Sequence, residues 1–480
     1  MKQNLVIGKY TLESLTNGMY SSPLDLYREY IQNSADSIDI ALVELDKNHC
    51  EFLIEIIIDE ENQSIIIRDN GIGVSSSISV ETLVNIGNSK KIRNTNRGFR
   101  GIGRLAGLGY CSTLTFTTSA IGESIKSIVM FDASKLRELL LSSDEKYTSV
   151  EDVMSQVLSY KTAPEKNTSH YFEVKMEGVS KYDGLLDFEL IKSYILQHAP
   201  LPFSKEFKWA SIIESKTQIA GYTIPSYNLT INGERLYKPY RNIFISDRVK
   251  KIDESIQDII VKEFCIDNKV SAILWYIKSN YFGTVVDNSI KGIRIRQGNI
   301  LVGDKTSCNR FFKEERFNGW IIGELHVIDK NIIANSRRDY FELNEAFHKL
   351  EEQIISWAAD ESSEIRKLSY ERNLTKAKQK IIESDENNLC IEDTSFTDEL
   401  HESDYLDYGE SESLAEVDYI GKLSSLLNQK NTQTKYTALN INSKLTTEQR
   451  KVLERVFDLI QEEYADDDAK RFINLIAKKY

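Results

Sequence analysis

The chain is poor in proline and cysteine, and each shortage narrows the class of protein. Only 6 prolines occur among 480 residues, which gives no support to a collagen-like or proline-rich structure. The cysteines are odd in number and widely spaced, and no two form a Cys-x-x-Cys pair. They are Cys50, Cys111, Cys265, Cys308 and Cys390. This pattern argues against a disulfide framework and a zinc knuckle, so we expect reduced and mostly packed thiols.

Long apolar segments are also missing. No stretch reaches the roughly 18 uninterrupted apolar residues of a membrane helix, and Met1–Asn4 leads into no signal peptide. We therefore expect a cytoplasmic protein without membrane contact. The length predicts roughly two to four domains. The content of 41% apolar and 28% charged residues is typical of globular domains that bury their own cores.

A net positive charge is missing as well. The chain carries 60 Lys and Arg against 73 Asp and Glu, a net charge of −13, which disfavours affinity of the whole protein for nucleic acid. Residues 291–316 differ, with seven basic side chains against three acidic ones. We interpret this segment as a solvated sheet edge, and contact with nucleic acid through it stays the alternative.

Apolar spacing predicts two α/β units. In the first, residues 1–200, we expect helices at 22–47 and 188–197 and strands at 52–58, 64–68, 113–118, 125–132 and 171–176. In the second, residues 201–375, we expect strands at 227–231, 270–277, 292–296 and 319–327 and a helix from 345 toward 372.

The last part of the chain has a different composition. Residues 383–418 hold fourteen Asp or Glu and no Lys or Arg, a run that repels itself and buries little apolar area. We therefore expect an acidic, flexible linker or partner-facing segment at 376–430. A capping-box signal at Thr446–Gln449 then predicts a short helical segment within 431–480.

Three polar residues recur along one face of the first predicted helix. Glu29, Asn33 and Asp36 are spaced by four and three residues, which places them on the same helix face. They interrupt an apolar stripe, and a buried carboxylate or carboxamide needs partners, which a metal ion with phosphates would supply. For this segment alone, an exposed polar stripe beside the core is an equal alternative.

Two further motifs are rich in glycine. Asp69-Asn70-Gly71-Ile72-Gly73 follows the predicted strand 64–68, and by itself Asn-Gly is typical of a hairpin turn. Residues 96–107 then read Asn-Arg-Gly-Phe-Arg-Gly-Ile-Gly-Arg-Leu-Ala-Gly. Glycines just before a helix let backbone N–H groups approach an anion, and the helix dipole favours negative charge there. We therefore expect phosphate binding near this stretch.

The order and spacing of these three motifs resemble the N-box, the first glycine box and the lid glycine box of the gyrase, HtpG chaperone, histidine kinase and MutL (GHKL) ATPase superfamily. Residues 85–90 (Asn-Ile-Gly-Asn-Ser-Lys) and 98–101 (Gly-Phe-Arg-Gly) are most similar to the MutL and HtpG branches. Thr168 matches a late Thr that helps hold adenine through water in the family. MutL proteins carry a Glu where this chain has Ile102, and we carry over neither an endonuclease nor a topoisomerase activity.

The resemblance implies a site for ATP and Mg²⁺. In it Asp69 would accept the adenine amino group, Gly73 would let the base approach the backbone, and Asn33 would ligate Mg²⁺. Gly101 and Gly103 would lend amides to the phosphates, while Glu29 would act as the general base toward water. The other nucleotide-binding residues that it implies are Asp36, Gly71, Asn88, Ser89, Lys90, Gly98, Phe99, Arg100, Ile102 and Thr168.

The second unit also resembles a domain of this superfamily. Residues 292–296 and 332–339 are similar to its transducer, a ribosomal-S5-like α/β domain, in which a basic residue reaches the γ-phosphate. Arg337 falls at the matching position, and an ion pair with Asp339 is the alternative. The implied fold is a Bergerat-type ATP-binding α/β sandwich (1–200), a transducer-like α/β domain (201–375), the acidic linker and short C-terminal helices.

The resemblance implies an ATPase of the GHKL type. ATP hydrolysis would drive closure of a lid at about 80–105 and dimerisation gated by ATP, with residues 1–20 exchanged between protomers. The dimer would control a protein partner, in DNA transactions or in genome (phage) defence. A non-hydrolysing, nucleotide-gated scaffold is one alternative. An HtpG-like chaperone is another, although residues after 430 are few for a dedicated dimerisation domain.

Overall fold

The computed structural model describes residues 7–12, 22–45, 47–85, 103–142 and 149–387, with the side chains described up to residue 379. Two compact units divide the chain at residue 390, and all described residues lie in the first. The expected helices within 431–480 and most of the acidic run lie outside these residues. No helix in the described ranges is both long enough and apolar enough to cross a membrane.

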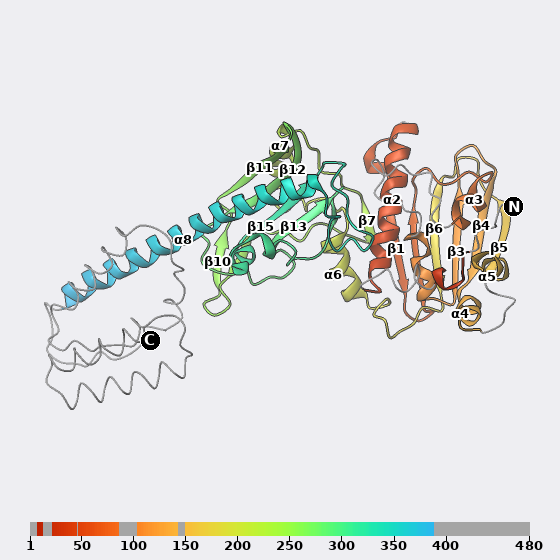
Figure 1. Cartoon of the computed structure of the whole chain (residues 1–480), viewed down its shortest axis with the longest axis horizontal. Coiled ribbons are helices and arrows are strands. Elements are labelled where there is room, and N and C mark those ends of the chain that lie inside the picture. Colours follow the sequence, from red (N-terminus) through yellow and green to blue (C-terminus); the bar gives the residue numbers. More distant parts are fainter. Residues whose placement is uncertain (1–6, 13–21, 46, 86–102, 143–148, 388–480) are drawn as a thin grey trace, which may run out of the picture. The chain divides into compact units, whose positions relative to one another are not determined.

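The first α/β part of the chain is built on an eight-stranded sheet (Figure 1). Its strand order is β5-β4-β3-β6-β2-β1-β7-β8. Its strands are β1 (Ile54–Asp59), β2 (Ser64–Asp69), β3 (Thr113–Ser119), β4 (Ile125–Asp132), β5 (Leu158–Pro164), β6 (Tyr171–Glu177), β7 (Leu229–Ile231) and β8 (Glu234–Arg235). Neighbours are antiparallel except β1 and β7, which run parallel. The sheet therefore includes residues 229–235, which follow the predicted boundary at residue 200.

Helices pack on one face of this sheet and bury its core. They are α2 (Asp25–Glu44), α3 (Ser79–Val84), α4 (Ala133–Leu141), α5 (Val150–Val157) and α6 (Phe188–His198), with short 3₁₀ turns η1 (His49–Glu51) and η2 (Gly103–Gly109). Buried side chains alternate with less buried ones along β1, as expected for a sheet covered on one side. Helical spacing of apolar residues predicts the buried face of α2, and five of its six positions lie in the core while Leu42 packs against it partly buried. The five are Leu26, Tyr30, Ile31, Ala35 and Ile38.

A second, five-stranded sheet has the order β11-β12-β15-β13-β14. The strands are β11 (Asp258–Ile266), β12 (Lys269–Lys278), β13 (Gly292–Gln297), β14 (Ile300–Leu301) and β15 (Ile322–Val327), beside a separate hairpin of β9 (Ile243–Ser246) and β10 (Ile252–Ser255). Helices α7 (Ala210–Ile219) and α8 (Glu345–Asn387) and the turns η3 (Asn309–Phe311) and η4 (Glu315–Trp320) complete this part.

Both faces of the second sheet are covered. Along β12, Leu274 and Tyr276 join the core formed with α8, while Trp275 and Ile277 join the core formed with α7. Because side chains alternate along a strand, a sheet covered on both faces has strands that are buried throughout. The expected mixed α/β fold class is confirmed. Helix α8 runs to Asn387, beyond residue 376, where we expected the linker to begin.

The described cysteines are all free. Cys111 and Cys308 are buried as expected, whereas Cys50 and Cys265 are exposed. The expectation of mostly packed thiols therefore holds for two of the four, because Cys50 lies in a surface turn and Cys265 lies on the outer strand β11.

Two arginines of the basic segment 291–316 are buried, contrary to our interpretation of a solvated sheet edge. Arg294 and Arg296 are each 1% exposed, because β13 lies between β14 and β15 and its polar face is covered. In the register of β13 with β15, Arg294 lies opposite Glu324 and Arg296 opposite His326. Contact with a phosphate backbone is thus excluded for these two side chains.

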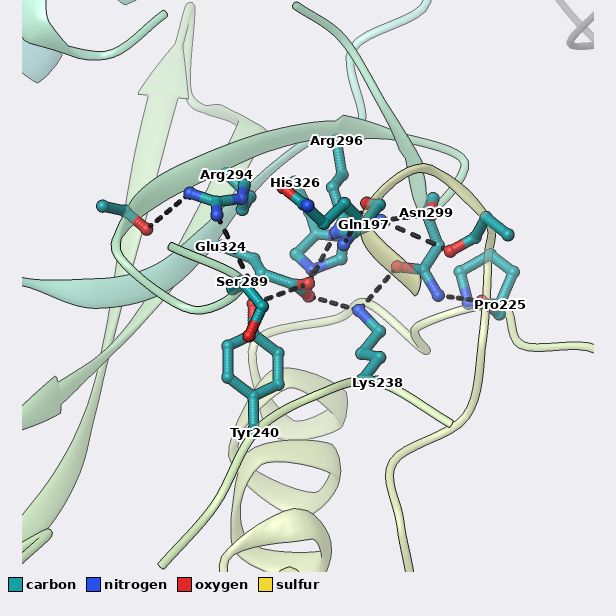
Figure 2. Close-up of polar contacts among 12 residues, drawn as sticks. Gln197, Pro225, Lys238, Tyr240, Ser289, Arg294, Arg296, Asn299, Glu324 and His326 are labelled. Atoms are coloured by element: carbon teal, nitrogen blue, oxygen red, sulfur yellow. Dashed lines mark hydrogen bonds and ion pairs between the residues drawn. The ribbon is translucent and has the colours of Figure 1, made fainter. Parts of the chain in front are cut away.

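Glu324 is the centre of this buried charged cluster, which Figure 2 shows. Its carboxylate accepts hydrogen bonds from Arg296 Nε, from Lys238 Nζ and from the Tyr240 hydroxyl (3.0 Å), and lies 3.1 Å from His326 Nε2. Arg296 and Lys238 hold the pKa of Glu324 well below its ordinary value, although burial opposes them. Burial and the neighbouring Arg296 lower the pKa of Lys238 to about 7.

Arg296 also joins the second sheet to the end of α6. Its guanidinium donates to the carbonyl of Gln197 (2.9 Å), in the last turn of that helix (Figure 2), and to the carbonyl of Ala199 (3.5 Å), which directly follows the helix. These carbonyls have no partner within the helix, and they carry the negative end of its dipole. The arginine therefore caps α6 from the second sheet.

Candidate functional site

Helix α2 presents the first motif along one side. The Glu29 side chain is 13% exposed, Asn33 is partly buried, and Asp36 is 3% exposed. The alternative interpretation of these three residues, an exposed polar stripe beside the core, is therefore wrong. These groups border the buried core rather than open solvent.

Gly103 lies against the carboxylate of Glu29. A Cβ atom at residue 103 would collide with Oε2 of Glu29, so any larger residue there would force this carboxylate to move. The hydroxyl of Tyr30 holds η2 in this place, because it donates to the Arg104 carbonyl (3.0 Å) and accepts from the Gly107 N–H (2.9 Å). The structure thus brings two predicted site residues, Glu29 and Gly103, together.

Arg28 connects Glu29 to the loop that contains Arg337. Its Nη2 lies 3.5 Å from Glu29 Oε1 and donates to the Arg337 carbonyl at 3.1 Å, while Nη1 pairs with Asp25 at 3.2 Å. The Arg337 side chain itself is exposed. Within the described residues it forms no ion pair with Asp339, which accepts a hydrogen bond from Asn335 instead.

The turn after β2 forms the other end of the site. Asp69 is 1% exposed, and its Oδ1 accepts from the Gly71 N–H at 3.0 Å. Gly73 has a φ of +68°, and a Cβ atom there would collide with the Ser119 carbonyl. Both glycines are therefore required by close backbone approach, so the second motif is more than a surface hairpin turn.

The ends of β3 and β6 support this turn through residues that the sequence analysis missed. Thr118 Oγ1 accepts from the Val74 N–H (2.8 Å) and donates to the Tyr171 carbonyl (2.9 Å). His170 Nδ1 lies 2.7 Å from the Gly71 carbonyl. Thr168, the predicted adenine contact, is exposed in the turn before β6. Thr118 and His170 become neighbours of this turn because β6 pairs with β2, with Phe172 opposite Asp69. No sequence motif marks the two residues.

The two ends of the candidate site are joined by α2. Glu29 marks the Gly103 end and Ser37, whose carbonyl accepts from the Ile72 N–H at 3.2 Å, marks the Asp69 end. Eight residues of helix separate them by about 12 Å. The other predicted nucleotide-binding residues lie outside the described ranges. They are Asn88, Ser89, Lys90, Gly98, Phe99, Arg100, Gly101 and Ile102.

The residues present fit a nucleotide with Mg²⁺. Asn33 offers an amide oxygen one turn from Glu29, and magnesium typically takes one or two protein oxygens together with phosphates and water. Among the described residues, Ser37 Oγ is buried without a hydrogen-bond partner at the Asp69 end, a polar atom that a ligand can satisfy. Glycine backbones at Gly71 and Gly103 border the same side of α2.

Comparison with known proteins assigns the part of the chain that holds these residues. Residues 25–162 match the family described as "Histidine kinase-, DNA gyrase B-, and HSP90-like ATPase". The chaperone protein HtpG of Rickettsia akari is 28% identical over 172 residues, which cover 32% of this chain and 27% of the chaperone. HtpG of Buchnera aphidicola subsp. Schizaphis graminum is 27% identical over 159 residues, 29% of this chain and 25% of the chaperone.

The chain thus spans about a quarter of the length of each of these relatives. The family match covers the part of the chain that contains Glu29, Asp69 and Gly103, and the resemblance to the HtpG branch is confirmed at low identity. A relationship to the MutL branch stays a prediction. Residues 25–162 of this chain are thus similar to the ATPase domain of the GHKL superfamily.

Proposed function

We propose that the protein binds ATP with Mg²⁺ between Glu29 and Asp69 and hydrolyses it. The observation that supports this most directly is the contact of the Glu29 carboxylate with the backbone of Gly103, at one end of a helix whose other end contacts the Asp69 turn. A carboxylate held beside glycine amides can act on water at a bound phosphate.

In this proposal the adenine base of ATP lies at the Asp69 end of the site. Asp69 accepts the adenine amino group, Gly71 and Gly73 allow the base to approach the backbone, and Asp36 lies alongside on α2. Gly103 lends its amide to the phosphates, with the help of the predicted lid residues 88–102. Asn33 would hold Mg²⁺, and the bound ion would supply positive charge to the phosphates.

Glu29 then acts as the general base. It takes a proton from a water molecule as the water oxygen attacks the γ-phosphorus, and the bond from that phosphorus to the β–γ bridging oxygen breaks. The products are ADP and phosphate, and the proton on Glu29 returns to solvent. Arg337 is proposed to neutralise charge on the γ-phosphoryl group. For this, its exposed side chain must turn toward the nucleotide.

Arg28 supports a coupling of nucleotide state to the second sheet. It contacts the proposed general base and the Arg337 backbone at the same time. We propose that ATP orders the lid and the Arg337 loop, that the closed state dimerises, and that the dimer controls a partner in DNA transactions or genome defence. In this structure residues 7–12 pack on their own chain, where Lys9 donates to the Leu139 carbonyl at 3.0 Å.

The test separates binding from chemistry with one substitution. Glu29→Gln should keep ATP and Mg²⁺ binding, measured by calorimetry, because the adenine and the phosphates of ATP contact other residues. The rate of phosphate release should fall about 10²–10⁴-fold, since the amide cannot accept the proton. Glu44→Gln changes an exposed glutamate of the same helix and should leave both quantities unchanged.

A second variant tests the Asp69 end of the site, where the adenine is proposed to bind. Asp69→Asn should abolish measurable ATP binding, because the amide presents a donor to the adenine amino group. Unchanged affinity in a folded Asp69→Asn protein would reject the site, and unchanged turnover in Glu29→Gln would reject the catalytic role.

Two other functions stay open. In a non-hydrolysing, nucleotide-gated scaffold, wild type would bind ATP but release no phosphate above the Glu29→Gln level. An HtpG-like chaperone is supported by the relatives over their matched quarter. It requires suppression of client aggregation that depends on ATP, which light scattering of a heated client protein measures.

A further inference from the structure

Hydrogen bonds from both backbone and side-chain groups hold the turn from Asp69 to Val74. The Asn70 side chain accepts from the Leu53 N–H (2.7 Å) and donates to the Glu51 carbonyl (2.8 Å). Asp69 accepts from the Gly71 N–H, and Thr118 accepts from the Val74 N–H. A turn held in this way is already organised before a ligand binds, which lowers the cost of binding.

The peptide bond between Gly71 and Ile72 is held from two sides. Its N–H donates to the Ser37 carbonyl of α2 at 3.2 Å, and its carbonyl contacts Nδ1 of His170, just before β6, at 2.7 Å. His170 is only 8% exposed. The peptide therefore bridges the helix and the sheet, and the imidazole supplies the contact on the side of the sheet.

Lys47 determines which nitrogen of His170 carries the proton. Its ammonium group lies 2.6 Å from Nε2, and an ammonium can only donate a hydrogen bond. Nε2 must then be the acceptor, so the proton of the neutral ring is on Nδ1. This proton points to a carbonyl oxygen, which can only accept. The two contacts agree on one tautomer and one ring orientation.

We propose that His170, oriented by Lys47, is a positioning residue that sets the nucleotide-base preference of this site. It acts through Gly71: the ring holds the Gly71 carbonyl, and the Gly71 N–H holds Oδ1 of Asp69. Asp69 is the group proposed to distinguish an amino group from a carbonyl on the base, so its orientation decides selectivity. This inference rests on the proposed ATP site, and it is separate from the water-mediated adenine contact that the family resemblance implies for Thr168.

The experiment compares four single variants in the full-length protein. Affinity for a non-hydrolysable ATP analogue with Mg²⁺ is measured by calorimetry, and GTP is measured by competition. His170→Ala should weaken ATP binding about tenfold, since it leaves a buried carbonyl without its partner. It should also reduce the preference for ATP over GTP. Asn167→Ala, in the exposed turn three residues before His170, should change neither.

The two remaining variants separate positioning from packing. His170→Asn places an amide donor near the position of Nδ1 and should restore ATP affinity and the preference for ATP. Lys47→Met removes the group that fixes the tautomer and should give an intermediate loss. Simple destabilisation of the fold lowers affinity for both nucleotides equally, so the ratio of the two affinities reports positioning alone.

The possible outcomes are distinct. If wild type binds ATP, Asp69→Asn abolishes binding and His170→Ala matches wild type, the role of His170 is rejected while the ATP site stands. If Asn167→Ala lowers the preference as much as His170→Ala does, the assignment to His170 is overturned. If His170→Ala fails to fold, a His170→Asn protein without the ATP preference overturns the proposal. If wild type does not bind ATP, the proposed function itself fails.

Discussion

At the scale of single residues, the glycines of the candidate site lie where the Cβ atom of any other residue would collide with a neighbouring atom. Gly103 faces the carboxylate of the proposed general base, and Gly71 faces Ser37 and Asp69. The requirement is close approach of the backbone rather than unusual φ, since only Gly73 of this group has a positive φ.

Gly103→Ala should therefore disturb Glu29 more than it disturbs the fold. The added methyl group collides with Oε2, so the carboxylate must move and the rate of phosphate release should fall at least tenfold. Steady-state phosphate release measures this change, and calorimetry should show that ATP binding changes less.

A double-mutant cycle checks the cause. In a Glu29→Ala background the colliding carboxylate is absent, so Gly103→Ala should cost less stability there than in wild type by urea unfolding. Equal costs in the two backgrounds would show that the methyl group disturbs something other than Glu29.

At the scale of elements, the packing of η2 on α2 brings the two halves of the catalytic end together. The Tyr30 hydroxyl supplies two hydrogen bonds to η2, and burial raises the pKa of this group well above its ordinary value. Arg104 adds contacts from the same turn to the end of α3, where its Nε donates to the Leu83 carbonyl at 3.1 Å. Burial lowers the pKa of Arg104 to about 10.

Tyr30→Phe should thus lower the free energy of unfolding by about 1–3 kcal/mol, because a buried carbonyl and a buried N–H lose their partner. Equilibrium urea denaturation measures the change. Tyr182→Phe is the matched control, since Tyr182 is 99% exposed, and its unfolding curve should match wild type. A Tyr30→Phe protein as stable as wild type would mean that water replaces the hydroxyl.

At the scale of the whole molecule, buried neutral histidines link stability to pH. Burial lowers the pKa of His198 and of His326 to about 4, from an ordinary value of 6.5. Burial is the main cause, and nearby cations such as Arg296 add to it, although the Tyr194 carbonyl beside His198 and the Glu324 carboxylate beside His326 favour the protonated rings. His198 stacks on Tyr194 at the end of α6, and His326 lies in the Glu324 cluster.

The direction of the pH effect follows from which state binds more protons. Between pH 6.5 and about 4 the unfolded chain is protonated at these histidines while the folded chain is not. The free energy of unfolding should therefore fall as the pH falls through this window. Urea unfolding at a series of pH values measures the slope, which His326→Gln should reduce.

His348 provides the control for this experiment. Its side chain is 57% exposed, so His348→Gln should leave the slope unchanged. Wild type and His326→Gln with the same slope would show that His326 does not contribute to the pH dependence.

Much of the local structure followed from the sequence alone. Apolar spacing predicted α2 and its buried face, and strand patterns predicted β3, β4 and β6 nearly to the residue. These features are local, because the period of side chains along a helix or strand is a property of the backbone. The spacing of Glu29, Asn33 and Asp36 is of this kind, and so is the family resemblance of the ordered motifs.

Tertiary structure decided which faces meet, and local patterns carry little information about this. Alternating Ile and Arg along β13 indicates that one face is polar, but only the sheet order places that face on Glu324, inside the protein. The chain path before β6 likewise brings His170 to the Gly71 carbonyl and leaves Thr168 exposed in the turn, and no local sequence pattern indicates this. The sequence determined which residues the site has to use, and long-range packing chose the neighbours that orient them.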